Sequence, residues 1–280
     1  MHTMGDASGF APLPRVGRIF RADCKVRLSD TGSDRRARLD ALARYLHDVA
    51  EDDASDAAMS PSVGWVLRKT IMTVARFPTL GERVRLDTFC SAVGSRWAER
   101  TTTITIDGLA AAQGVSVWVA IDVASGTPAR LDGHFDEVYG PSAAGRRASA
   151  RLALPPPPDD VRRRAHPWPL RSSDFDVWGH VNNAISWAAV EDAVDPARWM
   201  SLRAEVEHVA ALEPGATVSV ASQVADDGAS VWLLGPGRGP AEGAVPGSVY
   251  TAATLVRLGA GRVASTEQDG RLRGGRSHRD

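Results

Sequence analysis

The chain of 280 residues is long enough for two ordinary domains, and its formal net charge of −1 offers no bulk attraction to nucleic acid or to an anionic membrane. Its two cysteines, Cys24 and Cys90, are isolated in the sequence, so neither a disulfide framework nor a metal site is expected, and no cofactor is predicted. The first residues lack the apolar core of a secretory signal, and no apolar run approaches the ~18 residues of a membrane span. We therefore expect a cytoplasmic protein.

The first half of the chain predicts one helix and several strands. Residues 1–17 are expected to be disordered, and a β-like segment at 20–28 opens a unit that extends from 18 to 139. A helix is predicted over 35–51 because apolar residues recur there at steps of three and four, at Leu39, Leu42, Leu46 and Val49. β-rich segments follow at 63–77, 83–93, 96–106 and 114–124.

A proline- and arginine-rich stretch, 140–166, is predicted to link two units. Four consecutive prolines at 155–158 exclude a helix or a central strand and favour a stiff, extended spacer. Two interpretations of the surrounding arginines stay open, a solvated linker, which is the commoner case, and a surface that meets an acidic partner. These arginines are Arg146, Arg147, Arg151, Arg162, Arg163 and Arg164.

The second half, 167–260, repeats the order of the first. A short strand is predicted within 168–175 and a helix from about Val181, and residues 261–280 are expected to form a flexible tail. β-rich segments follow the helix at 200–210, 216–225, 230–237 and 248–258.

Matching residues indicate that the two halves arose by duplication. Arg27-Leu28-Ser29-Asp30 resembles Arg171-Ser172-Ser173-Asp174 at an offset of 144, and Gly81 matches Gly215 at an offset of 134. One long helix for each antiparallel sheet predicts an α+β fold of two tandem repeats, each a sheet wrapped around its helix.

Polar residues cluster just before the second helix, in the stretch DFDVWGHVNN from Asp174 to Asn183. A helix N-terminus offers unpaired N–H groups and partial positive charge, which suit a developing oxyanion. Asp176 can orient or deprotonate a water, His180 can move a proton, and Gly179 allows close approach of a substrate. The alternative is structural, because an aspartate before a helix is most often a cap and a lone histidine usually packs.

HVNN at the start of a central helix, in two tandem units, resembles the acyl-ACP thioesterases of plants and bacteria, which have the hotdog fold. The resemblance covers most of residues 18–258 and implies hydrolysis of fatty acyl-ACP to free fatty acid and holo-ACP. It implies a catalytic set of Asp176, His180, Asn182 and Asn183, in which the two asparagines serve mainly to fix the loop and the helix start. Substrate-binding positions are expected at Trp178, Gly179, Trp65 and Trp97.

The first repeat has the same frame without these groups, since Gly32 and Arg36 stand where Asp176 and His180 stand in the second. The resemblance therefore implies that residues 18–139 bind the acyl chain and that residues 167–260 carry the chemistry. Pocket candidates are apolar residues of the first repeat, although such residues are usually simple core: Trp65, Leu67, Ile71, Trp97 and Trp118.

The sequence departs from the plant members at two places. Trp178 replaces an asparagine, and the best alignment puts Val209 and Ala210 where a Glu-Cys pair is expected. Nearby polar residues, Glu205, Glu207 and His208, could reach the site, and strand alternation places both acids on one face. The predicted mechanism is therefore centred on Asp176, as general base or as nucleophile.

Several alternatives stay open. The same fold can act on acyl-CoA, or can bind an acyl group without hydrolysing it, and a dehydratase of this fold is a weaker possibility. Acyl carrier protein is acidic as a class, so arginines near the site would favour it over CoA; candidates are Arg162–Arg164, Arg68, Arg76, Arg96 and Arg100. No nucleic acid or membrane partner is expected, and the chain can be a monomer or a homodimer.

Overall fold

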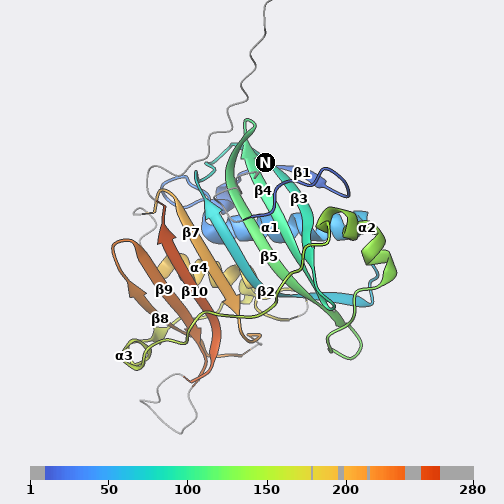
Figure 1. Ribbon diagram of the computed structural model, residues 1–280. Coiled ribbons are helices and arrows are strands. Elements are labelled where there is room, and N and C mark those ends of the chain that lie inside the picture. The colour runs from blue at the N-terminus through green and yellow to red at the C-terminus, as the bar shows by residue number, and fades with distance from the viewer. Residues whose placement is uncertain (1–9, 178, 195–198, 213–214, 237–246, 259–280) are drawn as a thin grey trace, which may run out of the picture.

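The computed structural model describes residues 10–177, 179–194, 199–212, 215–236 and 247–258. Its centre is one ten-stranded antiparallel sheet with the order β1-β3-β4-β5-β2-β7-β10-β9-β8-β6. The sheet has two halves, and each half covers one helix. The expected pair of tandem hotdog repeats is therefore confirmed (Figure 1).

The first hotdog contains the long helix α1 and the five strands that wrap it. Its β-rich segments match the predicted ones closely because alternating and β-branched residues define them. Its elements are β1 (Phe20–Lys25), α1 (Leu39–Asp56), β2 (Val63–Val74), β3 (Arg83–Val93), β4 (Trp97–Ile106) and β5 (Leu109–Asp122). Helix α1 starts and ends later than predicted, since Asp52–Asp56 continue it instead of forming a loop.

The second hotdog repeats this order with shorter elements. They are β6 (His166–Pro167), α4 (Asn183–Ala193), β7 (Leu202–His208), β8 (Ser219–Val224), β9 (Gly228–Leu234) and β10 (Val249–Arg257). The strand predicted within 168–175 is wrong: only His166–Pro167 pair with β8, and a 3₁₀ turn at Ser172–Asp174 follows.

The two hotdogs join edge to edge through β2 and β7. These strands pair antiparallel from Lys69–Glu207 to Val74–Leu202, with Ile71 opposite Glu205 at the centre. The 134-residue offset relates Ile71 to Glu205, so the junction lies on an approximate twofold axis. Helices α1 and α4 pack together beneath this junction, and one apolar core includes residues of both repeats.

The segment between the repeats packs against the sheet face that the helices leave uncovered (Figure 1). The Ala148 and Pro155 carbonyls accept hydrogen bonds from the indole N–H groups of Trp97 and Trp232. The buried carboxylate of Glu207 accepts the N–H groups of Ala153 and Leu154 at 2.8 and 2.9 Å. The expectation of a merely solvated linker is therefore wrong for this stretch.

Two further differences concern the ends of the predicted units. Helix α2 (Gly133–Ala143) crosses the predicted start of the linker at Gly140, and a short helix α3 (Asp159–Arg162) follows the prolines. Phe10 is buried, with the Arg203 guanidinium over its ring, so the segment predicted to be disordered is anchored at this residue. The predicted tail at 261–280 lies outside the described residues. Among the described residues, no helix is both long enough and apolar enough to span a membrane.

Candidate active site

The loop before α4 is built on the same frame as the loop before α1. The buried Asp174 carboxylate accepts the N–H of Arg171, and the Asp174 carbonyl accepts the N–H of Asn182. Asp30 makes the equivalent two contacts, with Arg27 and Arg38, in the first hotdog. These two aspartates are therefore structural in both repeats, as their matching positions predicted.

Asp176 closes the tight turn that carries the motif. Its N–H donates to the His180 carbonyl at 2.8 Å, and its Oδ1 accepts the His180 N–H at 3.0 Å. Gly179 has φ of +80°, a conformation that a side chain would strain, which explains glycine at this position. Asp176 is half-buried and His180 is exposed, so both lie at the surface of the turn. Trp178 lies outside the described residues.

Asn182, not Asp176, caps helix α4. Its Oδ1 accepts the N–H of Ala184 at 2.9 Å, which confirms the prediction that this residue fixes the helix start. Within the part of the chain that the structure describes, the N–H of Asn183, the first helical residue, has no hydrogen-bond acceptor. This N–H and the positive end of the helix are therefore available to an anionic or carbonyl oxygen.

The start of α1 differs at the equivalent group. The N–H of Leu39, which matches Asn183, donates to the Glu191 carboxylate of α4 at 2.8 Å. This contact joins the first residue of α1 to the end of α4, so the two helices are antiparallel. His47 lies eight residues after Leu39 on α1, and Asn183 lies eight residues before Glu191 on α4. Since both steps span about 12 Å at 1.5 Å per residue, His47 comes opposite Asn183. The 144-residue offset that relates Leu39 to Asn183 also relates His47 to Glu191.

A buried histidine from β7 completes the surroundings of the α4 start. His208 lies on the helix-facing side of β7 and pairs with Thr251 of β10, whose hydroxyl is 3.2 Å from Ser186 Oγ on α4. Burial, with smaller contributions from His47 and Arg68, lowers the pKa of His208 to about 3. Burial likewise lowers the pKa of His47 to about 4, so both imidazoles are neutral at physiological pH.

The expectation that Glu205 or Glu207 reaches the site is wrong. Both carboxylates lie on the other face of β7, where Glu205 pairs with Lys69 at 3.5 Å and Glu207 holds the linker. The strand alternation predicted their common face correctly but did not reveal which face turns toward the helices. His208, the third polar residue considered there, lies on the face of β7 that turns toward the helices.

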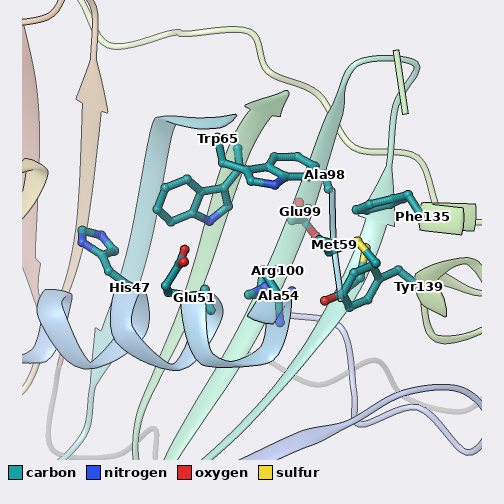
Figure 2. Close-up of a pocket in the computed structure, with 13 residues that line it drawn as sticks. His47, Glu51, Ala54, Met59, Trp65, Ala98, Glu99, Arg100, Phe135 and Tyr139 are labelled. Carbon is teal, nitrogen blue, oxygen red and sulfur yellow. The ribbon is translucent and has the colours of Figure 1, made fainter. Parts of the chain in front are cut away.

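A narrow cavity of about 70 Å³ lies in the first hotdog between α1, the sheet and α2 (Figure 2). In Figure 2, His47, Glu51 and Ala54 project from α1 along one side, and Phe135 and Tyr139 of the α2 region close the far end. The remaining lining residues are Ala50, Met59, Trp65, Cys90, Ala98, Glu99, Arg100 and Trp118.

The predicted pocket residues divide between the cavity and other places. Trp65 and Trp118 line the cavity, whereas Leu67 and Ile71 do not. The prediction for Trp97 is wrong: its indole N–H bonds the linker at Ala148, on the opposite face of the sheet. Trp97 of β4 pairs with Val119 of β5, one residue beyond Trp118, so Trp97 and Trp118 point to opposite faces of the sheet. The sequence alone left this register open.

Charged groups at one wall of the cavity are paired with each other. The buried Asp53 carboxylate accepts from the guanidinium groups of both Arg18 and Arg100. Arg100 also lies 5.3 Å from the Tyr139 ring centroid, and Glu99 accepts from Ser91 at 2.8 Å. Among the described residues, no three histidine, cysteine, aspartate or glutamate side chains gather closely enough to hold a metal ion.

Comparison with known proteins shows what this chain is similar to. Residues 17–139 match the family model of the acyl-ACP thioesterase N-terminal domain. The fold matches a 12:0-ACP thioesterase from Umbellularia californica with a TM-score of 0.68 at 18% identity, covering 85% of this chain and 96% of that one. The first hotdog is therefore similar to the N-terminal domain of acyl-ACP thioesterases, and the whole chain shares their fold. The family model covers the first hotdog, whereas the turn with Asp176 lies in the second.

Relatives by sequence are distant, at 22–24% identity. The uncharacterized protein Rv2001 of Mycobacterium tuberculosis is 24% identical over 217 residues, 76% of this chain and 86% of that protein. A chloroplastic palmitoyl-acyl carrier protein thioesterase of Arabidopsis thaliana is 24% identical over 205 residues, 65% of this chain and 49% of that enzyme. The matched region thus spans about half the length of the plant enzyme.

Proposed function

We propose that this protein is a thioesterase that hydrolyses fatty acyl-ACP to free fatty acid and holo-ACP. The observation that carries the proposal is the start of α4, where a free helical N–H lies next to the turn that holds Asp176 and His180. The match of residues 17–139 to the acyl-ACP thioesterase N-terminal domain supports the reaction class, and the same place in the first hotdog lacks both side chains.

The residues suggest how the reaction proceeds. The thioester carbonyl oxygen accepts the N–H of Asn183, and the positive helix end stabilises the negative charge that develops there. Asp176 accepts a proton from a water whose oxygen forms the new bond to the carbonyl carbon. The C–S bond then breaks, and the proton passes to the leaving thiolate, with exposed His180 as the group that can carry it. If Asp176 attacks instead, the C–S bond breaks as a mixed anhydride forms between Asp176 and the acyl group, and water then hydrolyses that anhydride.

The acyl chain is proposed to lie in the cavity of the first hotdog. His47 lines the cavity and also comes opposite Asn183, so a chain whose carbonyl is held at α4 can extend along α1 toward Tyr139. Residues 18–139 thus bind the chain, and residues 167–260 supply the reacting groups. Trp65 contributes to the wall of the cavity.

The carrier is proposed to be the acidic acyl carrier protein, held by arginines outside the cavity. Arg100 does not contribute, because it is paired with Asp53, and Arg76 is paired with Glu82. Arg162, Arg163 and Arg164 around α3 remain the main candidates; Arg162 donates to the Gly247 carbonyl, and Arg164 pairs with Asp160 at the surface.

The test is thiol release from matched acyl-ACP and acyl-CoA substrates. Wild type should turn over acyl-ACP, and reversing Arg162, Arg163 and Arg164 to glutamate should raise KM for acyl-ACP far more than for acyl-CoA. Reversal of three exposed arginines on β1 and β3, Arg21, Arg83 and Arg85, is the matched control. Equal effects on both carriers would contradict the proposed binding of acyl carrier protein by these arginines. Tight acyl binding without turnover on either carrier would instead make the chain an acyl-binding module, which Trp178 in place of the family asparagine would explain.

A further inference from the structure

Two ring nitrogens in the wall of the acyl cavity have no protein partner. Among the described residues, His47 Nε2 and Trp118 Nε1 are both closed off from solvent and lack a hydrogen bond. Both residues line the cavity, and their rings meet edge to face with centroids 5.5 Å apart. Since more than about 90% of buried polar groups in native proteins are paired, two neighbouring exceptions in one cavity indicate a missing polar ligand atom.

The chemistry of the two nitrogens specifies the ligand atom. An indole N–H can only donate, so the partner of Trp118 must be an acceptor. The imidazole of His47 is neutral and can donate or accept at Nε2, according to its tautomer. A hydroxyl oxygen or an oxo oxygen satisfies both nitrogens, whereas a plain methylene chain satisfies neither.

The position of the pair indicates which part of the acyl chain it meets. His47 comes opposite Asn183, where the thioester carbonyl is proposed to bind. Trp118 follows on β5, opposite Leu67 of β2 and Ala98 of β4. An oxygen held by this pair would therefore be carried by the carbons next to the carbonyl, and the apolar remainder of the chain would continue past Trp65 toward Phe135 (Figure 2).

We propose that His47 and Trp118 select acyl chains that carry a hydroxyl or oxo group close to the thioester, at about the third carbon. This inference rests on the proposed thioesterase function. An unsubstituted chain would bury both nitrogens without a partner, and sites built to bond a substrate oxygen discriminate strongly against analogues that lack it.

The experiment compares kcat/KM for three thioesters of one chain length on one carrier: unsubstituted, 3-hydroxy and 3-oxo. Wild type should favour one or both oxygenated chains by at least ~10-fold. Trp118→Phe keeps the aromatic ring without the N–H, and His47→Leu keeps the bulk without the nitrogens. Both should reduce that ratio toward one, mainly by losing activity on the oxygenated chains. Trp65→Phe, in the same cavity, is the control that should keep it.

The outcomes separate this inference from the function on which it rests. Equal or better hydrolysis of the unsubstituted chain by wild type would overturn the selectivity and leave the thioesterase standing. Variants that slow all three substrates equally would show that the pair is structural, which would also overturn it. No hydrolysis of any thioester by wild type would reject the proposed function and this inference with it. The wild-type ratio alone decides the matter if a variant fails to fold.

Discussion

The starts of helices α1 and α4 share one frame and differ in what occupies it. Asp30 and Asp174 bind the chain in the same way, yet the N–H of Leu39 is bonded to Glu191, while that of Asn183 has no acceptor among the described residues. At the position that matches Glu191, the first hotdog supplies the neutral His47. After duplication, the start of α1 has thus lost its open N–H because a carboxylate occupies it. The start of α4 keeps its open N–H because an uncharged group lies opposite it.

The largest difference in kcat should be between two variants, each of which changes one carboxylate in the turn before α4 or before α1. Asp176→Asn should lower kcat for thiol release at least ~100-fold, because an amide cannot accept the proton of the water. Asp34→Asn is the matched control: Asp34 accepts the N–H of Arg36 in the first turn, much as Asp176 accepts that of His180. The control should leave kcat within about twofold; a similar loss in both variants would show that the effect is not chemical.

His208 offers a second contrast, because the matching position in the first hotdog, at the 134-residue offset, is Val74. The pKa of His208 is lowered from 6.5 to about 3 by burial, so the native state binds fewer protons than the unfolded state. Stability is therefore complete above pH 6.5 and is lost as pH falls below it, by about 2 kcal/mol at pH 5 for this residue. His208→Val should flatten this loss.

Denaturant unfolding at pH 5 and pH 8 measures the difference. Wild type should lose more stability between the two pH values than the variant does. An identical pH dependence in both proteins would mean that His208 is not held neutral by burial in the folded state.

The smallest effect is expected at Glu191. Burial raises the pKa of this carboxyl from 4.5 to about 7, so the native state binds more protons than the unfolded state between these values. Its contribution to stability is complete below pH 4.5 and declines as pH rises through 7. Glu191→Gln keeps an acceptor for the N–H of Leu39 and should raise the free energy of unfolding at pH 8 by about 1 kcal/mol. A destabilised variant at pH 8 would mean that the negative charge itself is needed at the α1 start.

The sequence predicted most of the frame, because repetition and residue pattern carry it. Alternating β-branched residues located β3 within its observed bounds, and the Arg-x-Ser-Asp repeat located both loops. It could not show that the linker packs on the sheet, since that depends on Glu207 receiving two N–H groups from residues more than fifty positions away.

The candidate site was less predictable from sequence. The motif identified Asp176, His180 and the cap at Asn182, all within one stretch of chain. His47 comes from the helix of the other hotdog, which the pairing of β2 with β7 places beside α4. His208 comes from β7 and lies near the α4 start through its neighbour Thr251. A lone histidine on a helix gives no local signal of such a role.

The most direct test of this account is a crystal structure with a non-hydrolysable acyl analogue in which an amide replaces the thioester. The account predicts the analogue's carbonyl oxygen within hydrogen-bond distance of the Asn183 N–H, close to Asp176, and the acyl chain beside His47 in the first hotdog. A carbonyl bound instead at Leu39, with Glu191 displaced, or a chain outside that cavity would contradict it.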